Sequence, residues 1–160
     1  MNSYSGYLAD IAKWWSENIS QDWLSLRSET YGILQREDTL KEIVKLLGPE
    51  ALPDEEKLIL EVARMIKIGI LQQNSFDDVD TYCSPEKQFK LMKLQVDFYN
   101  KGQQALKDGA SLADIRSMDV ISLLLKARMD VKDDEMPKLD KIETDMAEQF
   151  KSITGVKVQN

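Results

Sequence analysis

Two aromatic residues flank a short acidic run near the middle of the chain, and this pattern suits a site for a flat ligand. Phe76 and Tyr82 are six positions apart, with the carboxylates of Asp77, Asp78 and Asp80 between them. Rings carried on a loop between two helices need apolar surface to cover. One hypothesis is a slot for a planar ligand. The alternative is that both rings fill the local core, as most aromatic residues of helical domains do.

Other groups that could carry out chemistry are scarce. The chain contains no histidine, the commonest general base and a common metal ligand. It has no Gly-x-x-x-x-Gly-Lys-Ser/Thr loop for phosphates, no Gly-x-Ser-x-Gly elbow and no cysteine–histidine pair. We therefore expect no catalytic residue, metal site or cofactor in this chain itself. An independent carboxylate-based hydrolase would have only unplaced acidic residues to support it.

The aromatic pair is flanked by two expected helices. The first runs from Pro53 to about Leu71 and is broadly apolar, which predicts a central position in a bundle. The second begins at Ser84 and Pro85, a capping residue followed by a proline at the first helical position, and should run to Asp108. The apolar residues that place the first helix in the core are Leu58, Ile59, Val62, Met65, Ile66 and Ile70.

Helical spacing of apolar residues predicts further helices before and after this pair. A capping-box pattern at Thr39 predicts a short helix that ends at Gly48, and another cap at Ser111 opens a short helix after Gly109. The remaining helices are expected over about 4–18, from an N-cap at Ser20, over 118–129 and over about 134–152. These elements predict an all-α fold, a bundle of about six to eight helices.

Length and composition agree with one helical domain over residues 1–160. With 42% hydrophobic residues the chain can form a real core, and its seven glycines and four prolines are few. A net charge of −7 argues against nucleic acid as a partner, because phosphates attract basic surfaces. No run of 18 apolar residues is present, so we expect no direct membrane insertion.

A turn rich in proline and acidic residues precedes the expected central helix. Pro53 suits the first turn of a helix, and the acidic residues after it suit the positive end of the helix dipole. A well-capped helix start therefore explains the pattern without any further function. The whole segment comprises Pro49, Glu50, Ala51, Leu52, Pro53, Asp54, Glu55 and Glu56.

The stretch from Glu61 to Lys87 resembles the C-terminal helical domain of the catalytic A subunit (alpha chain) of V/A-type, archaeal-type rotary ATP synthases. The resemblance extends from about residue 4 to about residue 151. One departure is Ile68-Gly69-Ile70, where the family usually has acidic residues and an aromatic, so the helix end is expected to bend differently. The matching residues are Glu61-Val62-Ala63-Arg64-Met65-Ile66, Leu71-Gln72-Gln73-Asn74, Phe76-Asp77, Val79-Asp80-Thr81-Tyr82-Cys83 and Ser84-Pro85-Glu86-Lys87.

The resemblance implies a role for both segments. In that family the loop closes over the adenine of bound nucleotide, which implies that Phe76 is the main adenine-facing ring, with Val79 and Tyr82 beside it. The segment Pro49–Glu56 lines up with the acidic loop of the related F-type beta subunit, which contacts the rotating central stalk. The central helix would then join the two sites as a rigid lever, a hypothesis that rests on its continuity.

The resemblance also implies a larger assembly. This chain would be a fragment that lacks an upstream nucleotide-binding domain, where ATP or ADP with Mg²⁺ binds. Its partners would be that domain, the B subunits of the catalytic hexamer and the central-stalk subunits. The complex would lie in the cytoplasm on the cell membrane and couple ATP synthesis or hydrolysis to proton or sodium transport. The rival interpretation is a free-standing acidic helical adaptor for a protein partner.

Overall fold

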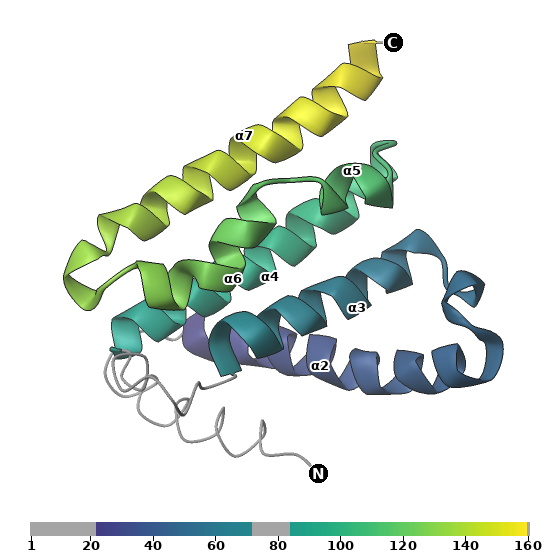
Figure 1. Ribbon diagram of the computed structural model, residues 1–160, viewed down its shortest axis with the longest axis horizontal. Coiled ribbons are helices and arrows are strands. Elements are labelled where there is room, and N and C mark those ends of the chain that lie inside the picture. Colours follow the sequence, from purple (N-terminus) through teal and green to yellow (C-terminus); the bar gives the residue numbers. More distant parts are fainter. Residues whose placement is uncertain (1–21, 72–83, 160) are drawn as a thin grey trace.

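The computed structural model describes residues 22–71 and 84–159 (Figure 1). Every regular element in these two ranges is helical, so the predicted all-α bundle is confirmed. Within the same ranges, no helix is both long enough and apolar enough to cross a membrane. The elements are α2 (Asp22–Leu47), η1 (Pro49–Ala51), α3 (Asp54–Ile66), η2 (Lys67–Leu71), α4 (Pro85–Lys107), α5 (Leu112–Arg116), α6 (Val120–Asp130), η4 (Asp133–Glu135) and α7 (Pro137–Gln159).

Helices α3 and α4 form the middle of the bundle. They pack against each other, and α2 packs against both of them (Figure 1). On the other side, α7 lies along α4 and α6, and α6 also contacts η2. The central position predicted for α3 is therefore confirmed.

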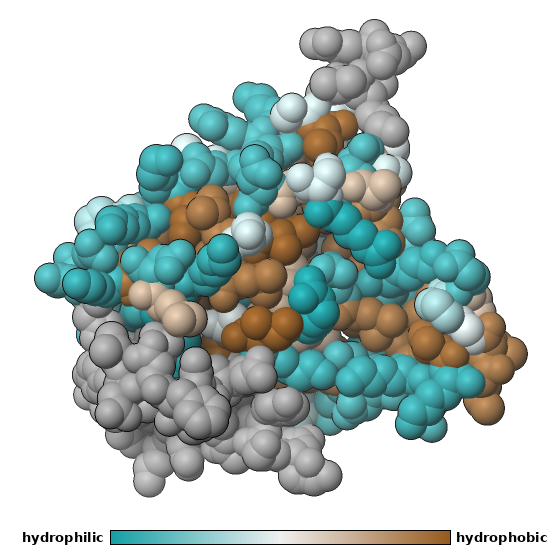
Figure 2. All heavy atoms as spheres, viewed as in Figure 1, coloured by the Kyte–Doolittle hydropathy of each residue, from teal (hydrophilic) through white to brown (hydrophobic). Residues whose placement is uncertain are grey.

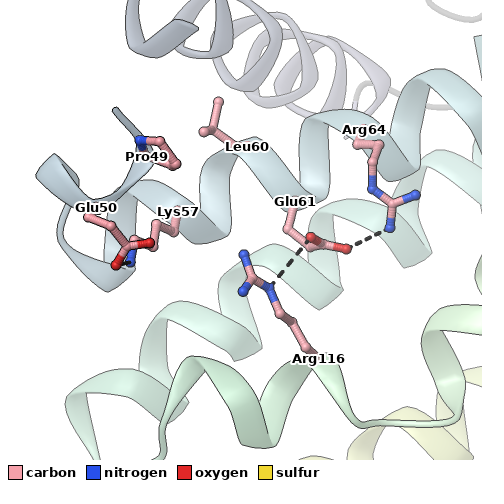
Figure 3. Close-up of a pocket in the computed structure, with 7 residues that line it drawn as sticks. All are labelled: Pro49, Glu50, Lys57, Leu60, Glu61, Arg64 and Arg116. Atoms are coloured by element: carbon pink, nitrogen blue, oxygen red, sulfur yellow. Dashed lines mark hydrogen bonds and ion pairs between the residues drawn. The ribbon is translucent and has the colours of Figure 1, made fainter. Parts of the chain in front are cut away.

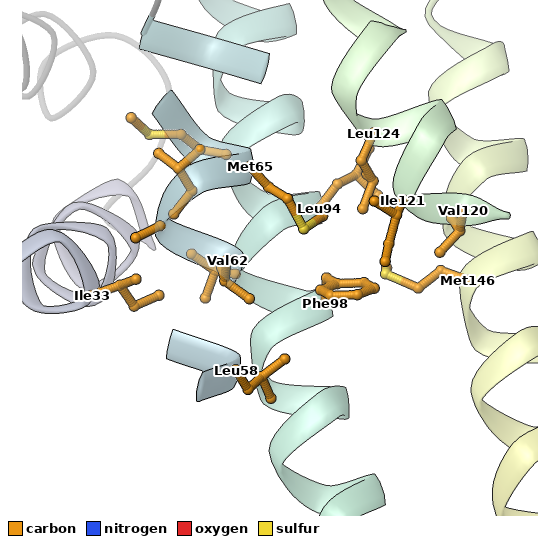
Figure 4. Close-up of a cluster of buried hydrophobic side chains, with 14 of the residues drawn as sticks. Ile33, Leu58, Val62, Met65, Leu94, Phe98, Val120, Ile121, Leu124 and Met146 are labelled. Carbon is orange, nitrogen blue, oxygen red and sulfur yellow. The ribbon is translucent and has the colours of Figure 1, made fainter. Parts of the chain in front are cut away.

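The core is built from apolar side chains of α2, α3, α4, α6 and α7, which converge in Figure 4. The rings of Phe98 and Phe150 meet across α4 and α7 with centroids 5.3 Å apart and a tilted geometry. The six residues of α3 and η2 predicted to face the core are all buried. Burial of one such side chain stabilises the fold by about 1.5–3 kcal/mol, so this face of α3 makes a large contribution to the stability of the domain.

A close approach joins the first turns of α3 to α4. A Cβ atom placed on Gly102 would lie 2.8 Å from Leu58 Cδ2, so a larger residue there would force that buried leucine to shift. Beside it, the Gln103 side chain donates a hydrogen bond to the Glu55 carbonyl at 3.1 Å. These two contacts fix the start of α3 against α4.

The predicted helix caps of the second half of the chain are confirmed. The Ser84 hydroxyl accepts a hydrogen bond from the Lys87 N–H at 3.2 Å, at the start of α4. Helix α4 ends before Gly109, whose φ of +104° is in the region that favours glycine. A reciprocal capping box between Ser111 and Asp114 then opens α5.

The predicted helix start at Thr39 is wrong. Helix α2 runs without interruption from Asp22 to Leu47, and Thr39 is an exposed residue in its interior. A capping-box pattern starts a new helix only where the preceding backbone is not helical, and no glycine or proline immediately before Thr39 favours such a break here. Near this point Glu37 is buried and pairs with Lys67, which holds the middle of α2 in place.

The remaining comparisons concern the last and the first predicted helices. The last helix begins at Pro137, after the short turn η4, and continues to Gln159, beyond the predicted end. The helix expected over 4–18 and the N-cap at Ser20 lie outside the described residues.

Candidate functional site

The turn between α2 and α3 forms one end of the bundle (Figure 1). We call residues Pro49–Glu56 the tip. Helix α2 is ended by Gly48, which has a φ of +88°. The chain then makes one 3₁₀ turn, in which the Leu52 N–H donates to the Pro49 carbonyl at 3.2 Å. Two prolines and this turn leave the backbone of the tip little freedom.

The structure separates the predicted stalk-contact residues by exposure. Leu52 is buried, with 5% of its surface exposed, and packs in the core beneath the turn. Glu56 is half-buried and pairs with Arg36 at 3.0 Å. Leu52 therefore anchors the tip and does not present its side chain to a partner. The exposed residues are Pro49, Glu50, Ala51, Pro53, Asp54 and Glu55.

Two leucines beside the tip extend its surface. Leu46 is 83% exposed and Leu47 is 72% exposed, at the last turn of α2. Figure 2 shows hydrophobic surface at this end of the molecule. Neither leucine was assigned to a site from the sequence. The sequence carried no clear signal for this exposure, since adjacent apolar residues such as Leu58 and Ile59 of α3 are both buried.

A hollow of about 350 Å³ lies next to the tip, between η1, α3 and α5 (Figure 3). We call it the charged hollow. Glu61 is its most buried acid, with 16% of the side chain exposed, and it pairs with Arg64 at 2.6 Å. Arg116, from α5, approaches the other carboxylate oxygen of Glu61 at 3.8 Å. The remaining lining residues are Pro49, Glu50, Lys57 and Leu60.

The opposite end of α3 is held by polar contacts, and we call residues Lys67–Leu71 the anchored end. This segment is a turn of π-helix, a geometry that frees backbone carbonyls from the regular helical pattern. Arg128 of α6 donates from Nη1 to the Ile70 carbonyl at 3.3 Å. The buried Lys87 of α4 in turn donates from Nζ to the Arg128 carbonyl at 2.7 Å.

Two more contacts from other helices hold the anchored end and the last turn of α3 just before it. The Glu37 carboxylate of α2, with 7% of its side chain exposed, forms an ion pair with Lys67 at 2.8 Å. The Gln95 side chain of α4 donates to the Met65 carbonyl at 3.4 Å. A Cβ atom on Gly69 would lie 3.1 Å from both Gln95 Nε2 and the Leu124 carbonyl, so α3 ends tightly packed.

Comparison with known proteins identifies the family. Residues 12–116 match the family described as the C-terminal domain of V and A type ATP synthase. The chain belongs to this family. It is 45% identical over 157 residues to the A subunit of the A-type ATP synthase of Hyperthermus butylicus, covering 97% of this chain and 26% of that protein. It is also 44% identical to the corresponding protein of Methanopyrus kandleri, over 96% of this chain and 26% of that protein. The V-type ATP synthase alpha chain of Halothermothrix orenii is 41% identical over 86% of this chain and 23% of that protein.

The chain spans about a quarter of the length of these curated relatives. The region that matches the V and A type family contains the tip, the charged hollow and the anchored end, and Arg116 is its last residue. Helices α6 and α7 come after this region, yet they complete the core around α4.

The residues predicted to face adenine, Phe76, Val79 and Tyr82, lie outside the described residues, as does Cys83. The structure describes the chain on either side of them, at Leu71 and Ser84, and both of these residues lie at the end of the bundle opposite the tip (Figure 1). The adenine assignment stays a prediction.

Proposed function

We propose that this chain is the C-terminal domain of the catalytic A subunit of an A-type or V-type ATP synthase, and that its tip contacts the central stalk. The observation that carries the proposal is the pair of exposed leucines, Leu46 and Leu47, beside an exposed acidic turn. Exposed apolar residues that adjoin each other on a rigid end are typical of a contact with another protein. Membership of the ATP synthase family supports the central stalk as that partner.

The proposed activity belongs to the assembled enzyme. ATP synthesis or hydrolysis would take place on an upstream nucleotide-binding domain that holds ATP or ADP with Mg²⁺, next to the B subunits. This chain supplies no catalytic group and acts by closing Phe76, Val79 and Tyr82 over adenine. The full complex lies on the cytoplasmic face of the cell membrane and moves protons or sodium ions across it.

Helix α3 and the anchored end join the tip to the segment that carries the adenine residues. Helix α3 spans Asp54–Ile66 without a break, at a rise of about 1.5 Å per residue. Such a helix transmits displacement between its ends when both are packed. Movement of the stalk against the tip would then displace the segment that contacts the nucleotide.

The tip contact is tested in the assembled complex by the double variant Leu46→Ser and Leu47→Ser. Rotation driven by ATP should be uncoupled from hydrolysis, because the apolar part of the contact is removed. Leu123→Ser is the matched control, since Leu123 is also exposed, at 40%, but lies on α6. Coupling that stays at the level of the control in the double variant would contradict the proposal.

A free-standing acidic adaptor is the rival proposal, and it differs in two observables. An adaptor would bind its partner without any nucleotide-binding domain, and substitution of Phe76 would not alter nucleotide selectivity. In the proposed enzyme, Phe76→Ala weakens the preference for adenine nucleotides over other nucleotides. Steady-state kinetics with ATP and GTP separate the two.

A further inference from the structure

Three cations gather in the charged hollow, on a chain whose net charge is −7. Lys57 and Arg64 come from α3, and Arg116 comes from α5. Two carboxylates, Glu50 and Glu61, share the same space, so the hollow holds one positive charge in excess. It is therefore a local exception on an acidic domain, and it adjoins the tip directly.

Two of these cations are held loosely. Arg116 Nε lies 3.8 Å from Glu61, and Lys57 Nζ lies 3.8 Å from Glu50, distances that are too long for hydrogen bonds. Within the described residues, neither side chain donates a hydrogen bond. Figure 3 shows the outer nitrogens of Arg116 turned away from Glu61 and toward the open space. Both groups thus have donors available for an incoming acceptor.

The carboxylates already present limit what can enter. Glu61 is committed to Arg64 at 2.6 Å, whereas the Glu50 side chain is 92% exposed and can swing away. One added carboxylate would neutralise the excess charge and accept hydrogen bonds from an arginine fork. A polyphosphate carries several negative charges and would be repelled by Glu61, so the charge balance favours a single acidic side chain.

We infer that the charged hollow binds an aspartate or glutamate side chain of the protein that meets the tip, with the carboxylate seated between Arg116 and Lys57. The inference rests on the proposed function, because one partner would cover the tip and the hollow together. The rim at Pro49 and Leu60 is apolar, and Figure 2 shows hydrophilic side chains between α3 and α5 near the hydrophobic surface at the tip end of the molecule. The matching partner surface carries an acidic side chain beside an apolar patch.

The test measures the affinity of the purified central-stalk subunit for the catalytic complex that carries each variant. Arg116→Glu should weaken binding by about tenfold or more at low salt, since a favourable charge contact becomes repulsive. The loss of affinity should be smaller at high salt, because salt screens both the original attraction and the new repulsion. Lys93→Glu is the matched control: its side chain is 51% exposed and pairs loosely with Asp97 on α4, so we expect a change of no more than about twofold.

A reciprocal experiment identifies the carboxylate. Each acidic residue of the stalk protein is changed to lysine in turn, and one such change should restore binding to the Arg116→Glu complex while it weakens binding to the unaltered complex. Rescue at one position supports the inference. No rescue at any position overturns it.

The outcomes distinguish this inference from the proposed tip contact. If Leu46→Ser with Leu47→Ser weakens stalk binding and Arg116→Glu does not, the hollow is unused and the tip contact survives. If neither variant weakens binding, both ideas fail. If inorganic triphosphate binds to the complex and Arg116→Glu abolishes that binding without affecting the stalk, the hollow is a phosphate site and the inference is wrong.

Discussion

At its first turn α3 adjoins the exposed tip, whereas at its other end it continues into a π-turn that α2, α4 and α6 hold in place. Ion pairs at the tip end are long or exposed, such as Lys57 with Glu50 at 3.8 Å. At the anchored end the ion pair between Lys67 and Glu37 is short, at 2.8 Å, and its carboxylate is buried. The same helix thus has one end free to meet a partner and one end locked into the domain.

This difference shows how a small domain can transmit a displacement from one end of a helix to the other. A contact surface must be accessible, and so its residues contribute little to the fold. The far end must resist being pulled apart, and buried polar contacts there fix one geometry. Substitutions at the two ends should therefore separate function from stability.

The largest expected effect comes from interrupting α3 itself. A Gly-Gly insertion after Ile66 should uncouple hydrolysis from rotation in the assembled enzyme, because glycine removes the stiffness of the helix. The control is the same insertion after Asp108, in the turn that follows α4. Single-molecule rotation with parallel measurement of ATP hydrolysis gives the result, and coupling that persists in the α3 variant would refute the lever.

The next largest effect is expected from Lys67→Met at the anchored end. Among the described residues, this change leaves the buried Glu37 carboxylate with Lys41, at 3.5 Å, as its remaining ion-pair partner, and it should lower the free energy of unfolding by about 2–3 kcal/mol. Urea denaturation measures it. Adding Glu37→Leu should recover much of the loss, since no unpaired charge remains buried.

The surface counterpart provides the control for that prediction. Lys45→Met removes an exposed pair with Glu42, and its effect should stay below about 0.5 kcal/mol. Equal losses from Lys67→Met and Lys45→Met would mean that the anchored end is no more firmly held than the surface.

Smaller effects, of opposite sign, are expected at two glycines. Gly69→Ala should destabilise the domain by about 1–2 kcal/mol, because the added methyl meets the Leu124 carbonyl and the Gln95 amide at 3.1 Å. Gly32→Ala in α2 has open space and should stabilise it by about 0.5–1 kcal/mol through helix propensity. Thermal unfolding followed by circular dichroism compares them, and a stabilising Gly69→Ala would show that this end of α3 has room to move.

The smallest effect on stability is expected at the tip. Leu46→Ser with Leu47→Ser should change the free energy of unfolding by no more than about 0.5 kcal/mol, since both side chains are already in solvent. The same denaturation curves measure it. A loss above about 2 kcal/mol would mean that these leucines pack in the fold, and their role in stalk contact would lose its support.

Much of the fold followed from local signals. The apolar face of α3, the Ser84 cap and the Ser111 capping box each depend on residues within one or two helical turns, and the structure has all three. The capping-box pattern at Thr39 failed because the same four residue types are also compatible with a helix interior, and only the preceding backbone decides between the two. Helix α2 is therefore longer than predicted at its C-terminal end.

The site was less accessible to sequence reasoning. Pro49–Glu56 was located correctly as a turn before a helix, but the burial of Leu52 depends on the core that forms beneath it. The pairing of Glu37 with Lys67 joins two separate helices, and Arg116 likewise reaches Glu61 from a different helix. Contacts of this kind arise from tertiary packing, which local patterns do not encode.

The most direct test of the account is a site-specific crosslink from the tip in the assembled complex. A photoreactive amino acid replaces Glu50 at the tip, or Leu123 on α6 as the control, and mass spectrometry identifies the crosslinked partner after irradiation. We predict crosslinks from position 50 to the central stalk, whereas position 123 should give none to the stalk. Crosslinks from position 50 that reach only neighbouring proteins of the catalytic ring would contradict the stalk contact on which the account rests.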